Sequence, residues 1–142
     1  MEDIVKYFYD FTQTENWTFS YGNRVNQNLL QSDLVSDKVY LLLDPVRRLK
    51  SFSEFGGSGY VSFEGSFLLV IKSNIDELYF ETLTSGKYGK NIKPMLESYL
   101  PKLENELNCS DYRIDSWVVT DVTDIFDINL DGIIVNYKIS IL

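Results

Sequence analysis

The sequence predicts a single α+β domain over residues 1–142, with a mostly antiparallel sheet of four or more strands and helices packed on one face. Three patterns indicate this class: a helical stripe of apolar residues over 88–107, strict alternation over 133–142, and apolar runs too short to be helices. The expected order is α-β-β-α-β-β, with a long hairpin between the two helices. Strands joined by turns favour antiparallel pairing, and the helices then cover one face.

Two segments have the periodicity of amphipathic helices. The first places Ile4, Tyr7, Phe8 and Phe11 at helical spacing. The second runs from Tyr88 to Leu107, and its apolar stripe consists of Tyr88, Ile92, Met95, Leu96, Tyr99, Leu100, Leu103 and Leu107. Because the stripe stays in phase across Pro101, that proline predicts a kink rather than a break. The segment 74–77 also has the character of a helix start.

Strands are expected in the remaining apolar segments. A short strand is expected near 16–19, and the run 39–43 is a buried strand that ends at Asp44-Pro45. The segment 46–73 is predicted to form a long hairpin, with the glycines of 56–59 near its tip and 60–73 as its far arm. Residues 68–71 are apolar on both faces, which places them in mid-sheet. The last two strands are expected over 112–122 and 133–142, joined by a turn at Asp131-Gly132.

The composition argues against several classes of protein. The chain has no histidine, so it lacks the commonest general base and the commonest neutral metal ligand. Its net charge of −8 disfavours a grip on nucleic-acid phosphates, although DNA can slide past an acidic surface. No apolar run approaches the ~20 residues of a membrane-spanning helix, and no secretory signal is expected. The single cysteine, Cys109, is expected in the core.

One motif resembles a metal-binding loop. Asp127, Asn129 and Asp131, followed by Gly132, match the opening of a calcium loop of the EF-hand type. The match fails at the twelfth place, where Lys138 stands instead of a glutamate, so a polar hairpin turn is the favoured interpretation. The glycines of 56–59 lack the Lys-Ser or Lys-Thr of a phosphate-binding loop. We therefore expect no cofactor, no metal and no enzymatic activity.

The most distinctive candidate for a binding surface is the hairpin near 46–60. Its basic and aromatic side chains are Arg47, Arg48, Lys50, Phe52, Phe55 and Tyr60. Aromatic residues and arginine are enriched in the cores of protein interfaces, so this hairpin is a candidate contact with an acidic partner or a neighbouring copy. An ordinary solvated strand face, with the aromatic rings in the chain's own core, is the alternative.

The layout as a whole resembles a family of viral structural proteins. The segments Lys93-Pro94-Met95-Leu96, Leu103-Glu104-Asn105-Glu106-Leu107 and 126–135 are similar to short proteins of tailed bacteriophages, including crAss-like phages. The resemblance runs from about Tyr40 to the end of the chain. The proteins that the chain resembles are tail-terminator and tail-completion proteins, which form the head–tail connector or neck ring.

This resemblance implies a structural virion protein without enzymatic activity, made in the host bacterial cytoplasm. Such proteins form rings of six or twelve copies at the head–tail junction, in contact with other phage neck, portal or tail proteins. DNA passes through the ring without specific binding, and no membrane is involved. A different class stays open: a small acidic cytoplasmic protein of the immunity type that neutralises a basic partner, since a charge of −8 suits steering toward such a partner.

Overall fold

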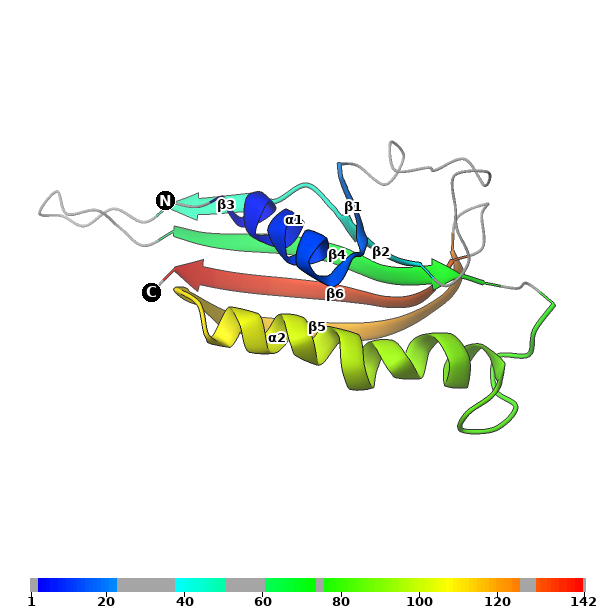
Figure 1. The fold of residues 1–142 in the computed structure, drawn as a ribbon. Helices are drawn as coiled ribbons and strands as arrows, with labels where there is room; N and C mark the ends of the chain where they lie inside the picture. Colours follow the sequence, from blue (N-terminus) through cyan, green and yellow to red (C-terminus); the bar gives the residue numbers. More distant parts are fainter. Residues whose placement is uncertain (1–2, 23–37, 51–60, 74–75, 126–129, 142) are drawn as a thin grey trace, which may run out of the picture.

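A computed structural model describes residues 3–22, 38–50, 61–73, 76–125 and 130–141 of the chain. In chain order, the elements are α1 (Ile4–Glu15), β1 (Thr18–Tyr21), β2 (Val39–Leu43), β3 (Arg47–Lys50), β4 (Val61–Lys72), η2 (Tyr88–Ile92), η3 (Met95–Tyr99), α2 (Leu100–Asn108), β5 (Tyr112–Ile125) and β6 (Leu130–Ile141). The protein is an α+β structure with both helical segments on the same face of one sheet (Figure 1). The predicted class and the helix-covered face are confirmed.

Within the described residues, the sheet has six strands: five lie in the order β1-β2-β4-β6-β5, and β3 pairs with β4 beyond the end of β2. Every pairing is antiparallel except that of β1 with β2. The predicted order α-β-β-α-β-β was wrong, because four strands rather than two precede the second helical segment. The predicted order omits β1, although a short strand was expected near 16–19, and it does not separate β2 from β3.

The strands β2 and β3 form two parts of one long strand against β4. The register runs from Val39 opposite Ile71 to Leu43 opposite Phe67, and resumes with Arg47 opposite Glu64. One extra residue separates the two parts, as in a β-bulge. Pro45 has no N–H to give to a ladder, so an irregular place in the strand suits it. The two arms of the predicted hairpin are confirmed, and its tip lies outside the described residues.

The main core lies between the helices and the sheet. Alternation along β6 predicts its inward face correctly: Ile133, Val135, Tyr137 and Ile139 are buried there. They meet the buried side of α1, which consists of Ile4, Phe8, Phe11 and Thr12. A second buried cluster lies on the opposite face of the sheet and contains Tyr40, Leu42, Leu68, Val70 and Leu130. The prediction that 68–71 sits in mid-sheet is therefore confirmed, since β4 lies between β2 and β6.

The second helical segment is continuous from Gly86 to Asn108 and contains two π-helical stretches, η2 and η3. Each stretch ends close to a proline: η2 two residues before Pro94, and η3 two residues before Pro101. Proline lacks an amide donor, so a π turn lets the chain pass such a site without ending the helix. The stripe over 88–107 is confirmed as helix, whereas Asp76 and Glu77 lie in a turn and a bend, so the helix start predicted there was wrong.

Two further expectations fail for identifiable reasons. The Asp131-Gly132 pair lies inside β6 rather than in a turn. An ideal Cβ on Gly132 would lie 2.0 Å from the carbonyl oxygen of Leu69, so glycine is required there by the close approach of β4. Cys109 is exposed at the end of α2 instead of lying in the core. In the part of the chain that the structure describes, no helix is long and apolar enough to cross a membrane.

Candidate functional site

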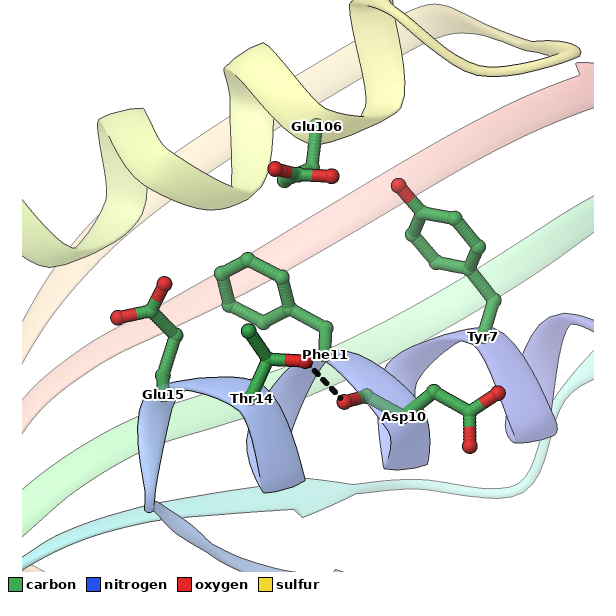
Figure 2. A pocket seen from close by; sticks show the side chains of 6 residues that line it. All are labelled: Tyr7, Asp10, Phe11, Thr14, Glu15 and Glu106. Carbon is green, nitrogen blue, oxygen red and sulfur yellow. Dashed lines mark hydrogen bonds between the residues drawn. The ribbon is translucent and has the colours of Figure 1, made fainter.

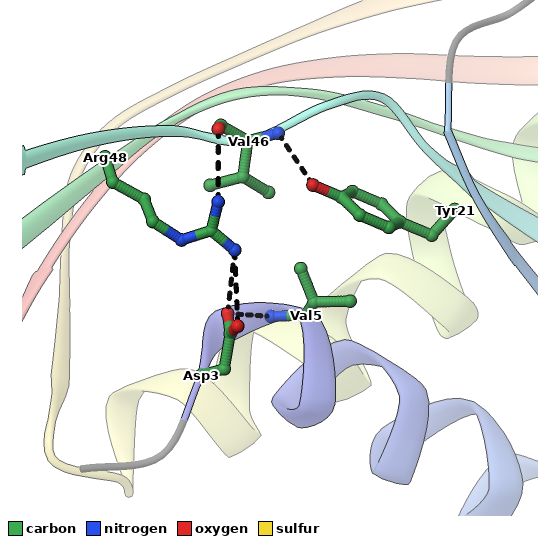
Figure 3. A network of polar contacts seen from close by, with 5 residues as sticks. All are labelled: Asp3, Val5, Tyr21, Val46 and Arg48. Atoms are coloured by element: carbon green, nitrogen blue, oxygen red, sulfur yellow. Dashed lines mark hydrogen bonds and ion pairs between the residues drawn. The ribbon is translucent and has the colours of Figure 1, made fainter.

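The predicted basic hairpin is only partly available for a partner. Arg48 turns toward the helices, and its Nη2 lies 3.1 and 3.3 Å from the carboxylate oxygens of Asp3 (Figure 3). Asp3 is also the N-cap of α1, where its Oδ1 accepts a hydrogen bond of 3.1 Å from the Val5 amide. The hydrogen bond to Asp3 raises the pKa of Arg48. Arg48 therefore fixes α1 to the edge of the sheet.

The Asp3 carboxyl responds to the same contacts. Burial alone would raise the pKa of Asp3, but the Val5 amide and the Arg48 guanidinium together lower it below its ordinary value. The ionised form is thus the one that the fold favours.

The remaining residues of the predicted hairpin have different positions. Arg47 lies on the other face of the sheet, with a side chain 74% exposed and its Nη1 3.8 Å from Glu64. Lys50 is exposed at the end of β3. Phe52, Phe55 and Tyr60 lie outside the described residues. The structure thus brings the three cations together on one edge strand, where Arg48 pairs with Asp3 and Arg47 with Glu64.

A different surface has the strongest character of a binding site, and the sequence patterns did not indicate it. It is the loop 78–83, whose large apolar side chains face solvent. The exposed fractions are 67% for Leu78, 49% for Tyr79, 55% for Phe80 and 64% for Leu83. Isolated exposed apolar residues are ordinary, but four within six residues form a patch typical of protein interaction sites.

The start of the loop 78–83 is held in place by the helix that follows the loop. The amides of Lys87 and Tyr88 donate hydrogen bonds of 2.9 and 2.8 Å to the carbonyl oxygens of Leu78 and Tyr79. Gly86 has a φ of +83°, and a Cβ there would lie 2.9 Å from the Glu81 amide nitrogen. Only glycine combines this backbone angle with this contact, so the loop has a defined closed shape.

Two side chains tie the same loop to its neighbours. The hydroxyl of Tyr79 donates a hydrogen bond of 3.4 Å to Asp121 on β5. Partial burial and the nearby Asp121 carboxylate raise the pKa of this tyrosine. At the base, Lys90 pairs with Glu77 at 2.7 Å. Exposed apolar side chains on such a fixed frame lose little conformational freedom on binding.

Behind the loop lies a buried polar cluster around Asp131. Its Oδ2 accepts hydrogen bonds from Ser73 Oγ at 2.5 Å and from Asn91 Nδ2 at 2.9 Å. Asp131 is fully buried, and Lys87 is 3% exposed. The cluster joins β4 and β6 to the helix that follows the loop. It gives Asp131 a structural role, while Asp127 and Asn129 of the predicted calcium loop lie outside the described residues.

A groove of about 210 Å³ separates α1 from α2 (Figure 2). Tyr7 and Phe11 provide its aromatic lining, and carboxylates of Asp10, Glu15 and Glu106 surround it. Two of the carboxylates have cationic neighbours, since Asp10 pairs with Lys6 and Glu15 with Lys102. In the described part of the chain, no group of three or more acidic or cysteine side chains is arranged to hold a metal ion.

Comparisons with known proteins give no relative. No family model matches the chain, and no curated protein and no solved structure is similar to it at a significant level.

Proposed function

We propose that this chain is a structural subunit of a ring at the head–tail junction of a tailed bacteriophage, either the tail terminator or another neck protein. In this proposal it acts through contacts with copies of itself and with neighbouring neck, portal or tail proteins, and catalyses no reaction. The copy number is expected to be six or twelve, and the ring to be part of the virion. DNA passes through its channel without specific binding.

The observation that carries the proposal is the exposed, preformed loop 78–83. Complete burial of a leucine or phenylalanine side chain contributes about 1.5–3 kcal/mol, and half of that remains available to a side chain that is half exposed. Four such side chains are enough to anchor an interface, in which a few apolar residues supply most of the binding energy. A soluble enzyme with an unrelated task has no need to keep such a patch in contact with water.

The charge of the chain supports the remainder of the proposal. Each copy carries a net charge of −8. A ring of such copies presents a negative field, which repels DNA phosphates and keeps the genome from adhering as it passes. Screening limits this field to about 8 Å at physiological salt, so it acts on DNA inside a narrow channel.

The state of association of the purified chain tests this proposal. We expect mass photometry and negative-stain electron microscopy to show closed rings, alone or after addition of neck components. The triple variant L78S/F80S/L83S should weaken association about tenfold or more, since each 1.4 kcal/mol lost is a factor of ten. The matched control is Tyr9→Ser, which removes an exposed aromatic side chain from α1. A chain that stays monomeric at high concentration with neck components present would contradict the proposal.

A second candidate function has one observation in its favour. The groove between α1 and α2 combines an aromatic lining with three carboxylates, which suits a lysine or arginine side chain of a basic partner. An immunity-type protein that neutralises a basic toxin would use such a groove. Gene neighbourhood separates the two candidates: capsid, portal and tail genes support the ring, and an adjacent toxin gene supports the inhibitor. Loss of binding to a basic partner in Glu106→Gln would point to the groove.

A further inference from the structure

The sheet has two different edges. At one edge lie β1 and β3, and at the other lies β5, which extends over fourteen residues (Figure 1). Within the described residues, no strand pairs with the outer side of β3 or of β5. An edge strand presents unpaired N–H and C=O groups, to which another strand can add.

The two edges have opposite charge. The four residues of β3 include Arg47, Arg48 and Lys50 and no acidic side chain. At the other edge, the described side chains of β5, of the turn before it and of the helix α2 that packs on it include Glu104, Glu106, Asp111, Asp115 and Asp121 against two cations, Lys102 and Arg113. The charges of these groups are therefore three positive on one edge and three negative, net, on the other.

The directions of the strands suit a contact between these edges. β3 is antiparallel to β4, β4 to β6, and β6 to β5, so β3 runs opposite to β5. If a second copy lies beside the first in the same orientation, its β3 therefore meets β5 in the antiparallel sense.

The register of the sheet indicates which residues would then be neighbours. One row across the sheet contains Arg47, Glu64, Lys138 and Ser116. Glu64 lies 3.8 Å from Arg47 and 3.6 Å from Lys138, so charges alternate along this row. The row ends at Ser116, and Arg47 of the next copy would continue it.

The same rows indicate which part of β5 a partner strand would meet. The rows of Arg48 and Leu49 reach β5 at Ile114 and Arg113. One bulge of β5 lies in this stretch, and Asp115 is its extra residue. The cations of β3 would therefore lie beside the Asp115 carboxylate of the neighbouring copy.

We infer that copies of this chain associate head to tail, with β3 of one copy adding antiparallel to β5 of the next so that the sheet continues from copy to copy. The inference rests on the proposed function, because it assumes that copies of the chain assemble. It adds which surfaces of neighbouring copies meet. Such a contact uses two different surfaces of each copy, so it repeats around a ring. The helices of all copies then lie on the same side of the continuous sheet.

A charge exchange tests the inference on the full chain. The variant R47E/K50E makes the β3 edge acidic, and D111K/D115K makes the facing part of the β5 edge basic. These substitutions leave the Arg48–Asp3 pair intact, and circular dichroism checks the fold of each variant. Each variant alone should associate about tenfold or more weakly than the unmodified chain, and a mixture of the two should regain association. The combined variant, with both edges reversed, should also regain it.

Cysteine pairs test the contact directly. In a Cys109→Ser background, R47C/S116C should form disulfide-linked ladders between copies under mild oxidation, and T14C/S116C, with one cysteine on α1, should not. Rings that persist in both charge variants and give no ladder would overturn the inference and leave the proposed function standing. Ladders and charge rescue in open filaments would support the edge contact and contradict the ring. A monomer that gives neither overturns both.

Discussion

The Arg48 guanidinium on β3 and the Asp3 carboxylate at the start of α1 form an ion pair 3.1 Å long between residues 45 positions apart in the chain. Asp3 thereby has two tasks, since it also caps the helix through the Val5 amide. The pair links the edge of the sheet to the helix that covers the core (Figure 3). It also holds Arg48, one of the three cations of β3, in a contact within the chain.

Removal of the Asp3 side chain separates the two tasks. Asp3→Ala should lower the free energy of unfolding by about 1 kcal/mol, because loss of an N-cap is the larger contribution and an exposed ion pair adds little. Asp3→Asn keeps a capping oxygen and should cost less. Urea denaturation at neutral pH measures both, and equal losses would show that the charge rather than the cap matters.

The dependence on pH follows from the lowered pKa of Asp3. A carboxyl whose pKa is lower in the folded state stabilises the fold above its unfolded pKa. That contribution is lost as the pH falls through the folded pKa, which lies below the ordinary value near 3.8. The difference in stability between the natural chain and Asp3→Asn should therefore shrink as the solution is acidified below about pH 4.

The elements of this fold were predictable where a repeating pattern decided them. The helix over 88–107 and the inward face of β6 followed from periodicity, because burial on one side imposes the same spacing on any such element. The end of β2 at Asp44-Pro45 was also predicted, but the continuation of the same line as β3 against β4 was not, since a bulge adds one residue without altering the character of the sequence. Asp131-Gly132 resembled a turn, but Gly132 is determined by the distance to Leu69, which lies 63 positions earlier.

The loop 78–83 was missed for a related reason. A search for periodic segments identifies apolar residues that are buried, and exposed ones in a loop follow no period. The available signal was the run Leu78-Tyr79-Phe80, which belongs to no helical or alternating pattern and lies close to Gly86. An apolar cluster outside any predicted element is therefore a reason to expect a binding loop.

The polar cluster around Asp131 should control the order of that loop. Asp131→Ala leaves the Ser73 hydroxyl and the Asn91 amide without their acceptor, at a cost of about 1–3 kcal/mol. Because Asn91 follows the loop on the same helix, amide exchange at Lys87 and Tyr88 should accelerate more than exchange in β2. Hydrogen exchange with mass spectrometry measures this. The control is Asp121→Ala, which removes only the exposed contact to Tyr79; an equal effect from both would contradict the role of Asp131.

Gly132 should tolerate no side chain. Gly132→Ala places a Cβ 2.0 Å from the Leu69 carbonyl oxygen and 2.8 Å from the Cα of Val70, so β4 and β6 must separate. Overpacking of this kind costs about 1–3 kcal/mol, and here the neighbour is backbone that cannot rotate away. Asn136→Ala, at an exposed position of the same strand, should change stability by less than about 0.5 kcal/mol. Equal midpoints of thermal unfolding for the two variants would refute the assignment.

Two tyrosines in one neighbourhood should respond in opposite ways to loss of their hydroxyl groups. The Tyr137 hydroxyl is buried and has no hydrogen-bond partner among the described residues, and burial raises its pKa strongly. The Tyr21 hydroxyl accepts a hydrogen bond of 3.3 Å from the Val46 amide. An unpaired buried hydroxyl destabilises a fold, whereas a hydrogen bond contributes about 0.5–1.5 kcal/mol. Tyr137→Phe should therefore leave the free energy of unfolding unchanged or increase it, and Tyr21→Phe should decrease it. Urea denaturation compares the two, and a loss of more than about 1 kcal/mol in Tyr137→Phe would mean that its hydroxyl is paired in solution.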